Sequence, residues 1–269
     1  MDSTGDLWDK QAPLVEFRNI TVVHRKRTVL DSLTVTIQGG EHIAVLGPNG
    51  AGKTAFIRAI TREYYPLVRE GSYSRIWGRE RWNVGDLRSA LGIVSNDLQS
   101  VFSRDFSGME VIVSGFFDSV GLFLREPAPD MIRKAEEIME FLEISHLRDR
   151  TMTEMSTGEA RRFLIARALI HEPRALVLDE PTNSLDLHAL HKFRLIVRKI
   201  ARSGTGVILV THNLPDIIPE ISRVILMKGG TIVKDGPKDK VLTDEAIGGL
   251  FDVPVSIRTD NGYYYATGY

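Results

Sequence analysis

The sequence of 269 residues contains no cysteine. Disulfides, thiolate metal sites and cysteine nucleophiles are therefore excluded. It also lacks an excess of either charge, because 34 basic residues stand against 35 acidic ones and the formal net charge is −1. This balance gives no long-range attraction to nucleic acid or anionic lipid, so we expect no nucleic-acid partner.

Long apolar runs are missing as well. No stretch approaches the roughly 18 apolar residues that a membrane-spanning helix needs. The polar, acidic start MDSTGDLWDK does not have the pattern of a signal sequence. If the protein serves a membrane process, we expect another chain to supply the membrane part.

Short runs of β-branched and apolar residues alternate with helical patterns along the chain. The runs at 42–46, 175–178 and 207–210 are continuously apolar, which predicts strands buried on both faces of a parallel sheet. Strands that alternate with helices predict an α/β fold with ligand sites at the carboxyl ends of strands. Further strand-like runs are found at 14–23, 33–37 and 224–227, and helical patterns at 51–63, 159–170 and 187–201.

Two regions depart from this alternation. Residues 224–234 predict a β-hairpin that turns at Gly229 and Gly230. Residues 98–155 have no buried-strand signal, and their 130–142 part is strongly helical in composition and spacing. We therefore expect a single domain in which residues 13–97 and 156–269 form the α/β core and 98–155 a helical subdomain.

A phosphate-binding loop is indicated at residues 47–54, which read GPNGAGKT and match G-x-x-x-x-G-K-[ST]. The loop follows an apolar strand and precedes a helical pattern, whose N-terminus favours anions. Glycines let backbone amides approach phosphates closely. Lys53 is expected to reach the β- and γ-phosphates and Thr54 to place its hydroxyl on Mg²⁺. The alternative is a glycine-rich turn without a ligand. The predicted nucleotide-binding residues here are Gly47, Pro48, Asn49, Gly50, Ala51, Gly52, Lys53 and Thr54.

Two adjacent carboxylates end the apolar strand in RALVLDEP, residues 174–181. Neighbouring residues of a strand point to opposite faces, so Asp179 and Glu180 should do different work. An Asp in this position holds Mg²⁺ in phosphoryl-transfer enzymes. Glu180 would then be free to act as a general base toward water. The alternative is that both carboxylates are solvated in a turn.

Two further motifs also favour a nucleotide site when they are considered together with the phosphate loop and the two carboxylates. His212 directly follows the strand in GVILVTH and could contact a γ-phosphate, although such a histidine alone is more often a capping or surface residue. In MSTGEARRFL, Ser156 and Glu159 have the spacing of a capping box that opens a helix. A Ser-x-Gly turn at a helix N-terminus is also a good anion site.

Together these residues resemble the nucleotide-binding subunits of ABC transporters over nearly the whole chain. GPNGAGKT resembles the Walker A loop, ALVLDE the Walker B strand, MSTGE the signature sequence that usually reads LSGGQ, and THN the segment of the switch histidine. PTNSLD, which ends at Asp186, resembles the dimer-contact loop. The resemblance implies a P-loop NTPase core with a mainly parallel sheet, an N-terminal antiparallel β part and a helical insertion.

The resemblance also implies a mechanism. An ATPase that uses ATP and Mg²⁺ would hold the metal with Thr54 and Asp179, and Glu180, His212 and Lys53 would be catalytic. Two cassettes would form a head-to-tail homodimer or pair, in which Ser156 and Gly158 of one subunit cover the γ-phosphate bound by the other. Integral-membrane permease subunits would be the further partners, and the protein would be cytoplasmic, on the cytoplasmic face of the membrane.

The sequence departs from the family pattern at several positions. Asn96 stands where the lid-loop glutamine that touches Mg²⁺ is usual, and Gln99 is a possible substitute. Thr157 and Glu159 replace the commoner glycine and glutamine of the signature. For the aromatic residue that stacks on adenine, His24 is the nearest candidate, with a solvated turn as the alternative.

The branch of the family bears on function. The insertion that begins MEVIVSGFFDSVGLF and the tail FDVPVSIRTDNGYYYATGY look most like ferric-siderophore and molybdate-type importer ATPases. Some members of the molybdate-associated branch are soluble, so the alternative is a soluble ABC ATPase in a nucleic-acid or ribosome-associated regulatory process. The leading hypothesis is that the protein is the ATPase subunit of an importer. Phe116, Phe117 and Phe123 are expected either to contact a permease or to pack in the core.

Overall fold

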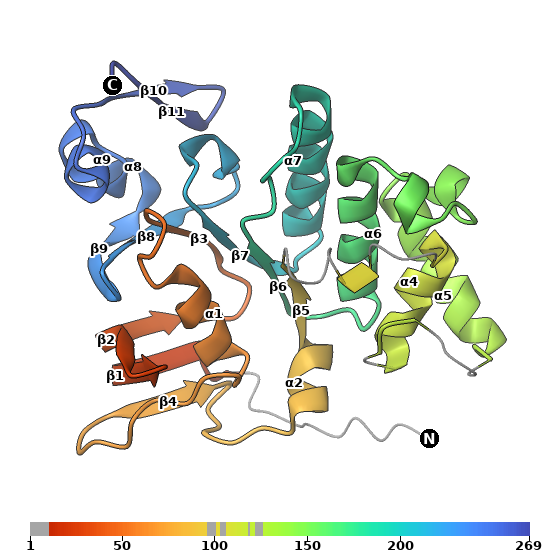
Figure 1. The fold of residues 1–269 in the computed structure, drawn as a ribbon, viewed down its shortest axis with the longest axis horizontal. Helices are drawn as coiled ribbons and strands as arrows, with labels where there is room; N and C mark the ends of the chain where they lie inside the picture. Colours follow the sequence, from red (N-terminus) through yellow and green to blue (C-terminus); the bar gives the residue numbers. More distant parts are fainter. Residues whose placement is uncertain (1–10, 96–100, 103–105, 118, 122–125) are drawn as a thin grey trace. The chain divides into compact units, whose positions relative to one another are not determined.

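The computed structural model describes residues 11–95, 101–102, 106–117, 119–121 and 126–269 (Figure 1). Asn96, Gln99 and Phe123 lie outside these residues. The chain divides into two compact units. Unit 1 comprises Met1–Leu87 with Val210–Tyr269, and unit 2 comprises Arg88–Leu209. The predicted subdivision at residues 98 and 155 stays a prediction.

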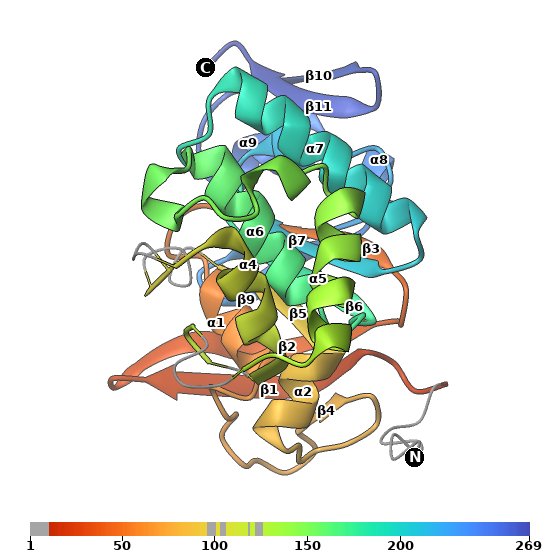
Figure 2. The same ribbon diagram turned by 90° about the vertical axis from the view of Figure 1, so that its right-hand side faces the viewer.

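Unit 1 contains an antiparallel sheet of strand order β2-β1-β4 (Figure 2). Strands β1 (Val15–His24) and β2 (Arg27–Ile37) form a hairpin whose two turn residues, Arg25 and Lys26, both have a positive φ. Two-residue turns of this hand match the twist of the flanking strands, so the hairpin forms without splaying. Strand β4 (Tyr73–Ile76) pairs with the other edge of β1. This is the predicted N-terminal antiparallel part.

Unit 1 also carries strands of the mainly parallel sheet. Strand β3 (His42–Leu46) pairs in parallel with β8 (Arg223–Lys228), and β8 pairs antiparallel with β9 (Thr231–Pro237). Gly229 and Gly230 form the turn between β8 and β9, with φ of 59° and 83°. Because a side chain strains this conformation, glycine suits both positions. The predicted strand at 42–46 and the predicted hairpin are both confirmed.

The remaining elements of unit 1 are short helices and a further hairpin, of which α8 and α9 contact β8. The C-terminal hairpin of β10 and β11 packs on η4, the short 3₁₀ helix that follows β7. Strand β7 (Gly206–Thr211) ends in this unit. The other elements are α1 (Lys53–Ile60), η4 (Leu214–Asp216), α8 (Lys238–Val241), α9 (Asp244–Phe251), β10 (Ser256–Asp260) and β11 (Tyr263–Thr267).

Unit 2 combines part of the parallel sheet, in the order β5-β6-β7, with a group of helices. Strand β5 (Leu91–Val94) pairs in parallel with β6 (Ala175–Asp179), whose first four residues are buried. Helices α4, α5 and α6 pack against one another (Figure 1), and α5 confirms the helix predicted at residues 130–142. The helical elements are α2 (Val84–Ala90), which begins in unit 1, α4 (Gly108–Val113), η1 (Ser114–Phe117), α5 (Pro129–Phe141), η2 (Ser145–Leu147), η3 (Met152–Glu154), α6 (Thr157–Leu169) and α7 (Leu187–Arg202).

Candidate nucleotide-binding and hydrolysis site

The phosphate loop of unit 1, residues 47–52, joins β3 to α1 and needs glycine at both ends. A Cβ atom at Gly47 would lie 2.3 Å from the carbonyl oxygen of Met227. At Gly52, where φ is 98°, it would lie 2.8 Å from the carbonyl oxygen of Val29. Backbone atoms cannot move aside as the tip of a flexible side chain can, so the neighbouring strands fix the loop tightly.

Lys53 is held inside this loop. Its side chain is only 6% exposed, and Nζ donates hydrogen bonds to the carbonyl oxygens of Gly47 at 2.7 Å and Pro48 at 3.1 Å. The first N–H groups of α1 have no acceptor within the helix, and the helix dipole adds partial positive charge at this end. Lys53 and Thr54 are the first two residues of α1, and Thr54 is exposed. The loop therefore presents a cation, amides and a hydroxyl at one place.

The loop is tied to the end of β7. The backbone N–H of Gly47 donates a hydrogen bond to the carbonyl oxygen of Thr211 at 3.3 Å. His212 is the next residue along the chain and is half-buried. The structure thus brings the backbone of the predicted switch histidine beside the first glycine of the phosphate loop.

His24 lies at the end of β1 with one ring face covered by a tyrosine. The rings of His24 and Tyr64 are stacked, with centroids 4.7 Å apart and an interplanar angle of 20°. The Arg58 guanidinium lies 5.4 Å from the centre of the Tyr64 ring and donates to its hydroxyl at 2.9 Å. The sequence analysis did not single out Tyr64, because nothing in TREYYP indicates which side chain turns back toward the hairpin. Adenine stacking by His24 stays a prediction.

In unit 2, β6 ends at the two carboxylates. Asp179 is its last residue and one carboxylate oxygen, Oδ1, is buried. Glu180 follows with a φ of 48°, an uncommon conformation for a residue with a side chain. Such a conformation costs on the order of 1 kcal/mol and is retained where the surroundings impose it, often at functional sites. The turn therefore re-aims the Glu180 side chain relative to the regular strand.

The signature segment opens α6 with the predicted capping box. The Ser156 hydroxyl accepts a hydrogen bond from the Glu159 N–H at 3.3 Å, and the Glu159 carboxylate accepts one from the Ser156 N–H at 2.8 Å. Burial raises the pKa of Glu159, but the two hydrogen bonds from Ser156 and the nearby Arg150 and Arg162 outweigh it, and the pKa is lowered from its ordinary 4.5. Glu159, which replaces the commoner glutamine, thus completes the cap as an anion.

Two motifs meet at Ala189 of α7. Asp186 caps this helix, because its Oδ1 accepts a hydrogen bond from the Ala189 N–H at 2.8 Å. Gly158 of the signature lies so close that a Cβ atom there would be 2.7 Å from the Cβ of Ala189. Both residues therefore have a local structural role besides the one that the resemblance implies.

The predicted magnesium ligands fit that metal chemically. The Thr54 hydroxyl and the Asp179 carboxylate are hard oxygen donors, which Mg²⁺ prefers. Thr54 belongs to unit 1, Asp179 to unit 2, and Asn96 lies outside the described residues. The assembled metal site stays a prediction.

Comparison with known proteins gives the family. Residues 30–183 match the ABC transporter family. This is more than half of the chain. The protein belongs to the ABC transporter family. An uncharacterised ABC transporter ATP-binding protein of Bacillus subtilis, YlmA, is 30% identical and is matched over 91% of this chain and 93% of its own length.

Other relatives and a solved structure agree. The hemin import ATP-binding protein HmuV of Nitrobacter winogradskyi is 32% identical over 91% of each chain. HmuV of Bradyrhizobium diazoefficiens is 28% identical over 94% of this chain and 93% of its own. A crystal structure of an ATP-binding cassette of an ABC transporter in its ADP conformation has a TM-score of 0.76 at 22% identity, and covers 89% of this chain and 98% of that one.

This ABC protein is therefore an ATP-binding subunit of an ABC transporter and an ATPase, with the P-loop NTPase cassette fold. The predicted fold class, ATP as ligand and ATPase activity are confirmed. Among the described residues, no helix is both long enough and apolar enough to span a bilayer.

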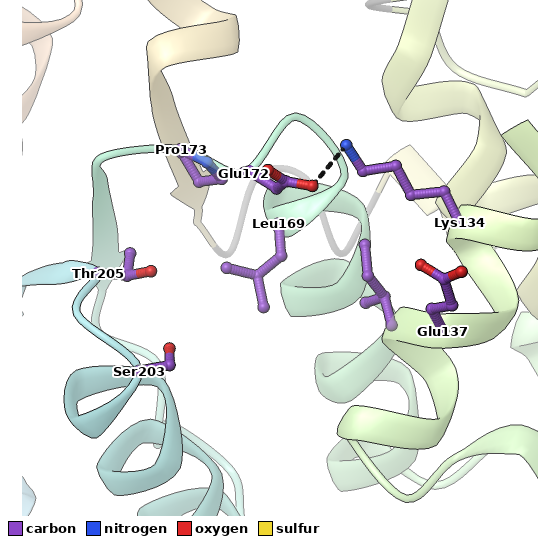
Figure 3. A pocket seen from close by; sticks show the side chains of 8 residues that line it. Lys134, Glu137, Leu169, Glu172, Pro173, Ser203 and Thr205 are labelled. Carbon is purple, nitrogen blue, oxygen red and sulfur yellow. Dashed lines mark ion pairs between the residues drawn. The ribbon is translucent and has the colours of Figure 1, made fainter.

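Unit 2 contains a cavity of about 320 Å³ (Figure 3). Lys134 of α5 and Glu172, after α6, form an ion pair of 2.9 Å at this cavity. The other lining residues are Glu137, Ile138, Leu169, Pro173, Ser203 and Thr205. Its lining contains none of the predicted nucleotide-binding residues.

Phe116 and Phe117 of η1 are half-buried. The ring of Phe116 meets the ring of His171 edge-on, with centroids 5.5 Å apart. His171 Nε2 in turn lies 3.0 Å from the carbonyl oxygen of Gly115. Phe116 therefore contributes to packing, and contact of these aromatics with a permease stays a prediction.

Proposed function

We propose that this cassette drives an importer by closing as a head-to-tail dimer around two Mg-ATP. The observation that carries the nucleotide part is the phosphate loop, in which buried Lys53 shares its ammonium between two loop carbonyls. ATP phosphates would take over these contacts, because a charged oxygen is a stronger acceptor than a neutral carbonyl. Relatives named as hemin import proteins support the direction of transport.

In hydrolysis, Glu180, Lys53 and His212 would each have a separate role. Glu180 accepts the proton of the attacking water, and the strained turn that carries it aims its carboxylate. Lys53 and the amides of the loop stabilise the charge that develops on the γ-phosphoryl oxygens. His212 donates to a γ-phosphate oxygen. Thr54 and Asp179 would hold Mg²⁺, which when bound would neutralise part of the phosphate charge.

The dimer is proposed from the signature segment. The capping box fixes Ser156 at the start of α6, a helix of 13 residues whose N-terminus favours an anion. Ser156 and Gly158 would cover the γ-phosphate held by a second copy, and Asp186 would lie at the contact between copies. A solved bacterial ABC transporter cassette, 21% identical with a TM-score of 0.67 over 83% of this chain and 98% of its own, is itself dimeric.

Permease subunits are the proposed membrane partners, which would bring the cassette to the cytoplasmic face of the membrane. The relatives are named as ATP-binding proteins of an ABC transporter or of hemin import, so the comparisons do not favour the alternative of a soluble regulatory ATPase. Asn96, at the lid-loop position, is proposed to touch Mg²⁺.

Affinity capture tests this proposal. Glu180→Gln protein, expected to bind ATP without turnover, is isolated from native cells with ATP and Mg²⁺ present. Lys53→Ala protein, which should not retain ATP, serves as the matched control. Stoichiometric recovery of a multi-span membrane protein supports the transporter subunit. Recovery of the homodimer alone, or of ribosomal or nucleic-acid components, would contradict it and favour the soluble alternative.

The direction of transport needs its own measurement. The captured complex is placed in vesicles with the cassette outside, and hemin is the first substrate to test because of the relatives' names. An importer moves substrate out of the lumen when ATP is added. ATP-driven accumulation in the lumen would show an exporter.

A further inference from the structure

The loop that follows β7 is organised around one threonine. Thr211 is fully buried, and its carbonyl oxygen accepts the N–H of Gly47, the first glycine of the phosphate loop. Its side-chain oxygen makes two further hydrogen bonds. Oγ1 accepts from the Asn213 N–H at 3.0 Å and donates to Asp216 Oδ2 at 2.6 Å. Thr211 thus connects Gly47 of the phosphate loop to Asn213 and Asp216, which follow His212 in the chain.

The bond between Thr211 and Asp216 is strong for physical reasons. Its 2.6 Å length is that of a hydroxyl donating to a carboxylate, and such bonds are about twice as strong as neutral ones. Asp216 is 3% exposed and Thr211 is fully buried, so water competes little for either group.

The far side of the loop is also supported. Asp216 belongs to η4, whose turn is closed by hydrogen bonds from the Asp216 N–H to Asn213 O and from the Ile217 N–H to Leu214 O. Strand β11 of the C-terminal hairpin packs on η4. The hairpin turn reaches the end of the same segment, since Gly262 lies against Pro219. Asp216 is therefore a fixed anchor rather than a surface carboxylate.

We propose that Thr211 and Asp216 are positioning residues, which hold His212 at a fixed place beside the phosphate loop. The hydrogen bond from the Asn213 N–H to Thr211 Oγ1 joins the residue after His212 to the residue before it. The backbone of His212 is therefore held from both sides. This inference rests on the proposed role of His212 in hydrolysis. Neither residue touches nucleotide in the proposal; both act through His212.

Steady-state ATP hydrolysis by the full chain tests this with Thr211→Val, which removes the hydroxyl and nearly keeps the shape. Displacing a reacting group by about 1 Å can cost on the order of a hundredfold in rate. We expect kcat to fall about tenfold to a hundredfold, with the KM for ATP within about twofold of wild type. Thr211→Ser restores the hydroxyl and should recover most of the rate.

Double variants separate positioning from general damage. If Thr211 acts only through His212, Thr211→Val lowers kcat in wild type but adds no further loss to His212→Ala. A purely structural defect would lower both rates by the same factor. Asp216→Asn is the second probe, because it removes the charge and keeps the size. It should give an intermediate loss that also vanishes in His212→Ala.

The results separate the role of His212 in hydrolysis from the positioning role of Thr211 and Asp216. Normal turnover in His212→Ala would overturn the proposed role of the histidine itself. Loss of turnover in His212→Ala, with normal turnover in Thr211→Val and Asp216→Asn, would overturn the positioning role alone. If Thr211→Val does not fold, as thermal unfolding would reveal, Asp216→Asn and its double variant decide the question in the same way.

Discussion

Gly158 and Ala189 are in contact so close that no side chain fits between them: a Cβ atom on the glycine would lie 2.7 Å from the alanine Cβ. Gly158 is in the first turn of α6, and Ala189 is in the first turn of α7, where its N–H donates to the capping Asp186. The signature segment and the dimer-contact loop are therefore joined through packing within one chain.

This contact predicts that Gly158→Ala destabilises the fold, although alanine usually favours helices. Because both methyl groups sit on backbone that must move, we expect a loss of about 1–3 kcal/mol in the free energy of unfolding. Denaturant unfolding of the isolated subunit measures it. The matched variant Gly249→Ala, in α9, has open space around its Cβ and should raise the free energy of unfolding by about 0.5–1 kcal/mol, the ordinary gain of alanine over glycine in a helix. Equal stability of Gly158→Ala and wild type would refute the packing argument.

Glu180 predicts a trade of stability against activity. Because its φ is 48°, Glu180→Gly should relieve strain and raise the free energy of unfolding by about 1 kcal/mol while abolishing ATP turnover. Glu180→Gln keeps the strained backbone and should abolish turnover with unchanged stability. Thermal unfolding of the three proteins makes the comparison. A glycine variant no more stable than the glutamine variant would show that the turn is not strained.

The capping box predicts a pH dependence. The pKa of Glu159 is lowered in the folded state, so the folded protein prefers the carboxylate more than the unfolded chain does. Its stabilising contribution is therefore present above the ordinary pKa of 4.5 and is lost as the pH falls through the lower folded value. The stability difference between wild type and Glu159→Gln should shrink as the pH is lowered from 6 toward 3. A difference that stays constant over this range would rule out this contribution.

For nucleotide affinity, the stack of His24 on Tyr64 makes a specific prediction. If His24 carries the adenine, Tyr64 supports it from behind, and Tyr64→Leu should weaken ATP binding together with His24→Ala. Stacking on an aromatic ring is worth about 1–3 kcal/mol for a nucleobase, so His24→Ala should raise the ATP dissociation constant about fivefold to 150-fold. Titration with a fluorescent ATP analogue measures this. Wild-type affinity in both variants would place the adenine elsewhere.

The sequence predicted those elements whose local signals agree. Strand β3 was predicted at its observed bounds, because after His42 four apolar residues run directly into the first glycine of the loop. The β8–β9 hairpin was predicted from Gly229 and Gly230. The capping box at Ser156 is a local pattern of four residues, and the structure confirms it.

Three other elements were not predicted, two because their sequence signals are weak and one although its signal is clear. Strand β4 has only four residues and little apolar alternation. Helix α9 contains Gly248 and Gly249, which lower helix propensity. The β10–β11 hairpin did have a signal, since Asn261 and Gly262 form the Asn-Gly turn that most strongly favours hairpins.

Tertiary relationships within the candidate site were beyond the reach of the sequence. Nothing in THNLPD indicates that the Thr211 hydroxyl meets Asp216, since both residue types are common in loops. The contact of Gly158 with Ala189 depends on how two helices pack. The backbone of Glu180 is strained only because of the turn that follows β6, and a DEP tripeptide does not specify it.

ATP binding and turnover measured side by side test the central claim most directly. Purified wild type, Lys53→Ala and Glu180→Gln proteins are compared in steady-state phosphate release and in retention of ATP with Mg²⁺. We predict turnover in wild type only, retention of unhydrolysed ATP by Glu180→Gln, and no retention by Lys53→Ala. Wild-type turnover in Glu180→Gln would contradict the account, because another group would then have to activate the water.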